Sequence, residues 1–75
     1  MAALLEDLAR RLVDEPGAVR VEQAEEDGEL VLRLYVAEAD RGKVIGRQGR
    51  VAKAMRTLLR AGGTREGRHT SLEIL

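Results

Sequence analysis

The spacing of hydrophobic residues predicts a helix at the amino end of the chain. Leucines and a valine recur there at intervals of three or four positions, which places them on one face of a helix over residues 2–13. Acidic residues precede arginines within this segment, an order that suits the helix dipole. Pro16 and Gly17 then stop the helical pattern, because proline cannot continue the backbone hydrogen-bond ladder.

Two strands joined by a tight turn are predicted next. Apolar and charged residues alternate from Val19 to Glu22, which is typical of a half-buried strand, and Asp27-Gly28 is a favoured hairpin turn. In the strand that follows, one face is formed by Leu30, Leu32, Leu34 and Val36. The opposite face carries Val31, Arg33 and Tyr35. The leucine face must meet a core, whereas Tyr35 is either an exposed strand residue or part of a partner interface.

The second half of the chain predicts a short helix over residues 38–45, a second helix from Arg50 and a last strand. At 100° per residue, the apolar arc of the second helix holds Val51, Ala52, Met55, Leu58 and Leu59. The opposite, largely basic arc holds Arg50, Lys53, Arg56, Thr57 and Arg60. Met55, Leu58 and Leu59 are expected in the core, with a subunit contact on part of this face as the alternative. Gly62 and Gly63 are expected to end this helix, with a polar loop to about His69 and a strand around Leu72 and Ile74. The predicted order is α-β-β-α-α-β.

Length and composition narrow the possible functions. A chain of 75 residues has room for one domain, residues 1–75, with a marginal core. It has no cysteine, which excludes disulfides, thiolate metal sites and a cysteine nucleophile. The amino terminus has neither a basic stretch nor a long apolar run, so no signal peptide or membrane span is expected and the cytoplasm is the expected location.

The charges divide sharply between the two halves of the chain, although the formal net charge is zero. Residues 1–40 carry eleven acidic and four basic side chains, and residues 41–75 carry nine basic and two acidic ones. The halves therefore carry net charges of −7 and +7. Because local potential steers a polyanion, any anion-binding surface is expected from residue 41 onward.

One segment, residues 40–50 (DRGKVIGRQGR), places two glycines around two polar residues between the predicted helices. Gly46 is expected to end the first helix in a left-handed conformation, and Gly49 to let another backbone approach closely. The backbone donors that begin the next helix, together with Arg47 between the glycines, favour a phosphate group. On spacing alone, a tight helix-to-helix turn explains the two glycines nearly as well.

Other chemistry lacks the residues it needs. A Walker loop requires an upstream glycine and a hydroxyl after Gly-Lys, and Gly42-Lys43-Val44 has neither. No histidine or serine is paired with a carboxylate in a way that acid-base or acyl chemistry requires, and His69 alone does not predict a metal site. We therefore expect no enzyme, no cofactor and no small-molecule substrate.

The segment VIGRQG (residues 44–49) resembles the signature of the KH domain, whose Gly-x-x-Gly loop clamps single-stranded nucleic acid. The predicted element order resembles the type II arrangement, which implies an α+β fold with a three-stranded mixed sheet and helices packed on one face. Nearly the whole chain resembles the bacterial KhpA (YlqC) family of single-KH RNA-binding proteins, through the leucine-rich first helix, residues 14–21 (DEPGAVRV) and residues 40–56.

The resemblance implies a single-stranded RNA-binding protein in which the loop clamps the phosphate backbone. The implied RNA-binding residues are Lys43, Ile45, Gly46, Arg47, Gln48, Gly49, Arg50 and Lys53. Arg65, Arg68 and His69 would extend this basic surface or form a plain solvated loop. The resemblance also implies a homodimer, a complex with the larger KH protein KhpB (Jag/EloR), and an RNA chaperone or regulator linked to cell-wall homeostasis and cell elongation. The alternative is a protein-protein interaction module with a KH fold and incidental RNA affinity.

Overall fold

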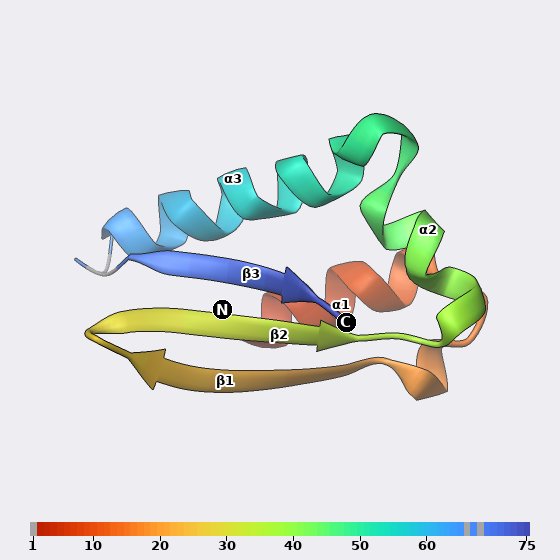
Figure 1. Ribbon diagram of the computed structural model, residues 1–75, viewed down its shortest axis with the longest axis horizontal. Coiled ribbons are helices and arrows are strands. Elements are labelled where there is room, and N and C mark those ends of the chain that lie inside the picture. Colours follow the sequence, from red (N-terminus) through yellow and green to blue (C-terminus); the bar gives the residue numbers. More distant parts are fainter. Residues whose placement is uncertain (1, 66, 68) are drawn as a thin grey trace.

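One three-stranded sheet and the helices packed against it form the protein (Figure 1). The computed structural model describes the backbone of residues 2–65, 67 and 69–75, and the side chains of residues 2–62, 67 and 69–75. The elements are α1 (Ala2–Leu12), β1 (Arg20–Glu26), β2 (Glu29–Tyr35), α2 (Arg41–Ile45), α3 (Arg50–Arg65) and β3 (Thr70–Ile74). Single 3-10 turns lie at Pro16–Ala18, Glu38–Asp40 and Arg47–Gly49. The predicted element order and the α+β class are confirmed.

The sheet has the strand order β1-β2-β3, with β2 antiparallel to β1 and parallel to β3. A two-residue turn joins β1 to β2, and Asp27 and Gly28 adopt φ values of 52° and 78° there. Positive φ at both central residues is the requirement of a type I′ hairpin turn, which Asp-Gly satisfies at little cost. With one antiparallel and one parallel pair of strands, the sheet is mixed, as the resemblance to the type II arrangement implied.

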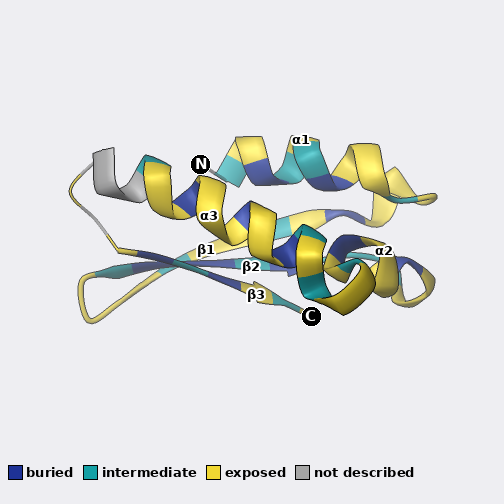
Figure 2. Cartoon of the chain, turned by 90° about the horizontal axis from the view of Figure 1, so that it is seen from above, coloured by how far each residue is buried: buried dark blue, intermediate teal, exposed yellow. Residues whose placement is uncertain are grey.

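The leucine face of β2 is the centre of the core. Leu32 and Leu34 are fully buried, and they pack in one cluster with Leu5 of α1, Val44 of α2 and Leu59 of α3. Figure 2 shows that the buried positions of α1 and α3 lie on the sides of these helices that face the sheet, while their outer sides are exposed. All three helices therefore cover the same face of the sheet, and α2 is held to that core through Val44.

The face of the sheet opposite the helices carries charged side chains and one aromatic side chain, which contact one another. Tyr35 is half-buried there, and the guanidinium carbon of Arg20 lies 4.3 Å from the centroid of its ring. Arg33 reaches Glu26 on β1 at 2.9 Å and Glu73 on β3 at 3.5 Å, and these carboxylates raise its pKa. The position of Tyr35 is thus explained by contacts within the chain.

Two expectations about α3 were wrong. The helix does not end at Gly62 and Gly63 but continues to Arg65. Two glycines cost a helix about 2 kcal/mol in intrinsic propensity, which packing of the same helix against the core offsets. Leu58, expected in the core, is 53% exposed, whereas Met55 and Leu59 are buried as predicted. Among the described residues, no helix combines the length and the hydrophobicity needed to cross a bilayer.

Candidate nucleic-acid interface

The two predicted motif helices meet at a short turn, called the 46–49 loop below. Helix α2 ends at Ile45, and the Gly46 N–H still donates to the Gly42 carbonyl at 2.8 Å. Residues Arg47–Gly49 then form one 3-10 turn, and α3 begins at Arg50. Figure 1 shows this loop at the end of the molecule opposite the turn between β1 and β2. The basic loop and the acidic hairpin turn are therefore well separated.

Gly46 is the residue that the loop geometry requires to be glycine. Its φ of 77° and ψ of 170° lie in a region that is essentially restricted to glycine, not in the left-handed helical region that we expected. A Cβ at this position would lie 2.4 Å from Val51 Cγ2 and 2.9 Å from the Val51 backbone nitrogen. The close approach expected at Gly49 thus occurs at Gly46, where the loop folds onto the first turn of α3.

The second half of the loop is held by two backbone hydrogen bonds. The Gly49 N–H donates to the Gly46 carbonyl at 3.1 Å, and the Arg50 N–H donates to the Arg47 carbonyl. Gln48 and Gly49 have φ values of 56° and 73°, so a non-glycine residue occupies the left-handed region at Gln48. No described atom of the chain lies within 4 Å of a Cβ built at Gly49. This part of the loop is open to a ligand.

The polar side chains predicted for RNA binding lie together on the exposed side of this turn. Arg47, Gln48, Arg50 and Lys53 are all exposed. An Arg50 guanidinium nitrogen lies 3.4 Å from Gln48 Oε1, a long hydrogen bond that leaves both groups free to turn toward a ligand. Ile45, the last residue of α2, adds an apolar side chain that is 37% exposed beside these cations. Lys43 is exposed as well, but it differs from these residues because its ammonium is paired with carboxylates of the chain.

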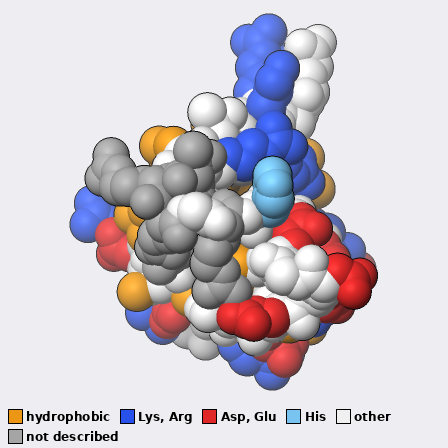
Figure 3. Space-filling view, turned by 90° about the vertical axis from the view of Figure 1, so that its left-hand side faces the viewer, with side chains coloured by type: hydrophobic (Ala, Val, Ile, Leu, Met, Phe, Trp, Pro, Cys, Tyr) orange, Lys and Arg blue, Asp and Glu red, His pale blue; other side chains and the backbone are white. Residues whose placement is uncertain are grey.

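The basic surface continues along α3. Arg56 and Arg60 are exposed on the same arc of the helix as Lys53, as the periodicity predicted. Figure 3 shows Lys and Arg side chains gathered at the top of the view, on the side of α3, while lower down Asp and Glu side chains lie among further Lys and Arg side chains. The exposed cations along α3 thus extend the basic surface beyond the loop.

Lys43 is engaged within the protein. Its ammonium forms an ion pair with Asp14, and its Nζ lies 3.7 Å from Asp40 Oδ1. The hydrogen bond from Lys43 to Asp14 is the largest of the contributions that raise the lysine pKa, so the ammonium stays charged. The residue that the motif suggested as a phosphate contact is therefore already paired with two carboxylates.

Asp40 is a residue to which the sequence analysis assigned no role. It is 2% exposed and precedes α2, yet its side chain does not cap that helix; Oδ2 instead accepts the Glu15 N–H at 3.0 Å. Burial alone raises the pKa of Asp40. The N–H groups of Glu15 and Asp14 and the charge of Lys43 lower this pKa by more than burial raises it, so the net shift is downward. The spacing of Asp40 and Lys43, three residues apart at a helix start, was the only sequence signal for this pair.

The loop before β3 contributes less to the described surface. His69 is exposed, and its carbonyl accepts the Leu30 N–H at 2.8 Å, which ties the start of β3 to β2. The side chain of Arg65 and the whole of Arg68 lie outside the described residues. The predicted extension of the basic surface by these two arginines stays a prediction.

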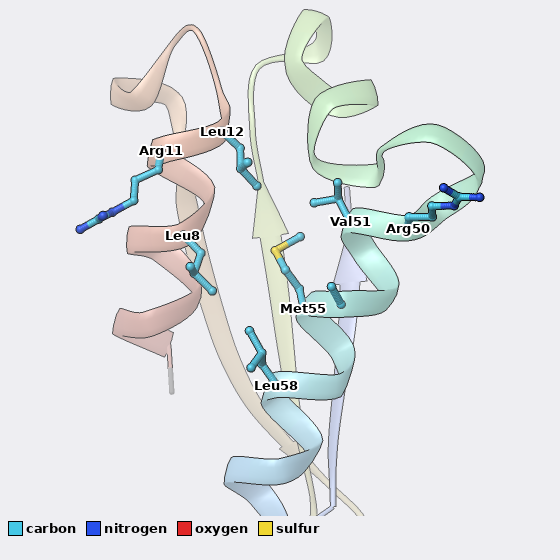
Figure 4. A pocket seen from close by; sticks show the side chains of 8 residues that line it. Leu8, Arg11, Leu12, Arg50, Val51, Met55 and Leu58 are labelled. Carbon is cyan, nitrogen blue, oxygen red and sulfur yellow. The ribbon is translucent and has the colours of Figure 1, made fainter.

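A groove runs between α1 and α3, beside the loop (Figure 4). It has a volume of about 490 Å³ and is lined mainly by apolar side chains from the two helices. The lining consists of Leu8, Arg11, Leu12, Arg50, Val51, Ala54, Met55 and Leu58. Figure 4 shows the leucines of α1 pointing toward Met55 and Leu58, while Arg11 and Arg50 point away from the space between the helices. The groove is thus an apolar face with a basic rim.

A family model described as "KhpA/KhpB, KH domain" matches residues 2–74. The chain belongs to the KhpA/KhpB KH-domain family. Its fold is the type II KH arrangement, and the 46–49 loop between α2 and α3 has the sequence Gly-Arg-Gln-Gly. The KhpA/KhpB KH-domain family is not a known enzyme family.

Relatives from several bacteria resemble the chain over nearly its whole length. A protein of Clostridium acetobutylicum is 44% identical over 75 residues, which is 100% of both chains. One from Aquifex aeolicus is 46% identical over 72 residues, covering 96% of this chain and 91% of its own. One from Bacillus subtilis is 44% identical over 71 residues, covering 95% and 88%. Each of these relatives is named "RNA-binding protein KhpA".

Proposed function

We propose that this KH domain binds single-stranded RNA without catalysis, through the backbone phosphates that the 46–49 loop contacts. The observation that carries the proposal is the exposed Arg47-Gln48 pair, presented on a glycine-bounded turn beside Arg50 and Lys53. The names of the relatives support RNA as the polyanion. A loop of this kind holds a backbone segment of about four nucleotides.

The mode of binding follows from which side chains the domain contains. Tyr35 is the single aromatic residue and lies on the opposite face of the sheet, so bases are not stacked on an aromatic platform. Ile45 offers an aliphatic contact next to the loop, and the cations contact phosphates. One such domain is expected to bind weakly and with a strong dependence on salt.

Salt titration tests the phosphate contacts directly. With Arg47, Arg50 and Lys53 each on one phosphate, we expect a plot of log binding constant against log salt with a slope of about −2 for single-stranded RNA. Arg47→Gln is expected to make that slope shallower by about 0.7, since one fewer counterion is released. Fluorescence anisotropy with a labelled, mixed-sequence single-stranded RNA measures both slopes. A binding constant that barely changes with salt would favour the rival function, a protein-protein interaction module with incidental RNA affinity.

We also propose that the chain forms a homodimer through the groove between α1 and α3. Leu12 and Leu58 are 40% and 53% exposed there, beside Met55 and Val51 of the same apolar lining. A second copy related by a twofold axis presents the same leucines, so the two grooves cover each other. A chain of this length has a marginal core, and burial of these side chains in a dimer adds to its stability.

Leu58→Asp is expected to convert the dimer to a monomer without unfolding the domain. Leu58 is mostly exposed in the single chain, so its replacement leaves the core intact, whereas a carboxylate buried in the apolar dimer contact loses its hydration. Sedimentation velocity at tens of micromolar measures the mass. Thr57→Asp, an exposed neighbour outside the groove lining, is the matched control and is expected to stay dimeric. A wild-type chain that sediments as a monomer at this concentration contradicts the proposal.

The cellular part of the proposal comes from the family resemblance. We propose a complex with KhpB, because one family description covers the KH domains of both proteins. The expected role is an RNA chaperone or post-transcriptional regulator in the cytoplasm, linked to cell-wall homeostasis and cell elongation. Sequencing of RNA cross-linked to the chain in its own cells, with and without a changed loop, identifies the transcripts involved.

A further inference from the structure

Three segments that are far apart in the sequence meet beside α2. Asp40 lies immediately before this helix, Lys43 lies one turn into it, and residues 14–15 follow α1. The Asp40 carboxylate accepts the Glu15 N–H with one oxygen and faces the Lys43 ammonium with the other. The same ammonium pairs with Asp14. The junction therefore joins the end of α1 to the start of α2.

The two ion pairs of Lys43 differ in weight because their carboxylates differ in burial. The Asp14 side chain is 78% exposed, so its attraction for Lys43 is largely screened by water. The Asp40 side chain is 3% exposed, and a buried carboxylate without a nearby cation is strongly unfavourable. Among the described residues, Lys43 is the cation that forms an ion pair with the Asp40 carboxylate. Its main role in the free protein is thus to neutralise Asp40.

The junction lies where it sets the direction of the 46–49 loop. Helix α2 has five residues, and the Gly46 N–H is hydrogen-bonded to the carbonyl of Gly42 within this helix. Any rotation of α2 therefore moves the loop with it. Val44, fully buried in the core, holds one side of the helix. The ion pair of Lys43 with Asp14 and the hydrogen bond from the Glu15 N–H to Asp40 hold another side. A short helix that is attached at a single point can rotate about it. With two points of attachment, the orientation of α2 is fixed.

We propose that Lys43 is a positioning residue for the 46–49 loop and not a phosphate contact: as the counter-ion of buried Asp40, it holds α2 against residues 14–15. This inference deepens the proposed RNA-binding function and rests on it. It separates Lys43 from Arg47, Arg50 and Lys53, whose side chains have no carboxylate partner among the described residues.

A double-mutant cycle between Lys43→Gln and Asp40→Asn tests this assignment. The amide side chain introduced by Asp40→Asn keeps an oxygen for the Glu15 N–H but needs no counter-ion, so the loss of Lys43 matters little in its presence. Lys43→Gln alone is expected to weaken binding of the mixed-sequence single-stranded RNA about fivefold. The same change made in the Asp40→Asn background is expected to weaken it less than about twofold, and Lys43→Arg is expected to bind nearly as well as the wild type.

The salt slope gives a second, independent measurement. A positioning residue changes affinity but releases no counterion, so Lys43→Gln is expected to leave the slope unchanged, whereas Arg47→Gln makes it shallower by about 0.7. A direct phosphate contact requires that Lys43→Gln makes the slope shallower and weakens binding equally in the wild type and in the Asp40→Asn background. That result would overturn the assignment. It is equally overturned if Lys43→Gln leaves RNA affinity unchanged.

Hydrogen exchange separates a failure of this inference from a failure of the proposed function. Lys43→Gln is expected to speed amide exchange at Gly46 and Gly49 about fivefold, and Asp40→Asn in the same chain to restore it. This measurement needs no RNA. If Arg47→Gln leaves RNA affinity and the salt slope unchanged, the proposed function is wrong, and the exchange rates still decide whether Lys43 positions the loop. Unchanged exchange in a folded Lys43→Gln protein contradicts the positioning role.

Discussion

Replacing Arg47 and Gln48 together by aspartate is expected to weaken RNA binding by about 100-fold or more, equivalent to about 2.7 kcal/mol, while the domain stays folded. The change removes one cation and places two carboxylates where phosphates approach, and like charges in contact cost several kcal/mol. Both side chains are exposed, so no core contact is lost. Gln48 has a φ of 56°, a conformation that aspartate tolerates well. Anisotropy titration measures the affinity, and circular dichroism checks the fold.

The matched control makes the same change further along α3. Arg56→Asp with Thr57→Asp alters the net charge equally, on exposed positions of α3 beyond the loop. We expect this control to weaken binding by less than about tenfold, since it acts through the general field of the domain. Equal losses in the two double variants would mean that RNA responds to total charge alone, and the loop would not be a clamp.

The sheet and the first helix were predictable because local chemistry and tertiary structure agree there. The alternation of leucines in β2 placed Leu30, Leu32 and Leu34 on the buried face. Asp27-Gly28 formed the turn that its residues favour. These signals depend on neighbours within a few positions, so a single sequence is enough to detect them.

The limits and faces of α3 depended on distant contacts. Gly62 and Gly63 have low helix propensity, but packing of α3 against the core carries the helix past them. The apolar arc predicted Met55, Leu58 and Leu59 together, although Leu58 faces the groove and not the sheet. Periodicity shows which side chains form the apolar face of a helix, but it does not separate core positions from exposed apolar positions.

The sequence predicted which residues lie at the candidate site more fully than it predicted their contacts and backbone conformations. The charged loop residues were correctly expected to be exposed together. Nothing in the sequence distinguishes the two glycines, whose roles depend on the contact of Gly46 with Val51. The pairing of Lys43 with Asp14 spans 29 residues, a separation at which local patterns carry no information. The contact of Gly46 with Val51 and the pairing of Lys43 with Asp14 are thus the features of the site that the residue pattern did not predict, and the RNA contact assigned to Lys43 stays a prediction.

Gly46→Ala is expected to lower the free energy of unfolding by about 3 kcal/mol and to abolish measurable RNA binding. The φ and ψ of Gly46 cost a residue with a Cβ about 1–3 kcal/mol. The new methyl group would also overlap Val51, with 2.9 Å to a backbone nitrogen that cannot move without shifting α3. A domain of this size has few kcal/mol of stability, so the loss is large. Urea denaturation followed by circular dichroism measures it.

Gly49→Ala is the control that isolates the clash from the backbone conformation. Gly49 also has a positive φ, 73°, but a Cβ there meets no described atom within 4 Å. Its replacement is therefore expected to lower stability by only about 1 kcal/mol, the usual cost of a left-handed alanine. RNA binding is still expected to weaken in this variant, because the methyl group projects from the open side of the loop toward the bound backbone. If the two alanine variants were equally stable, Val51 would not constrain Gly46, and the loop would owe its shape to the glycine conformations alone.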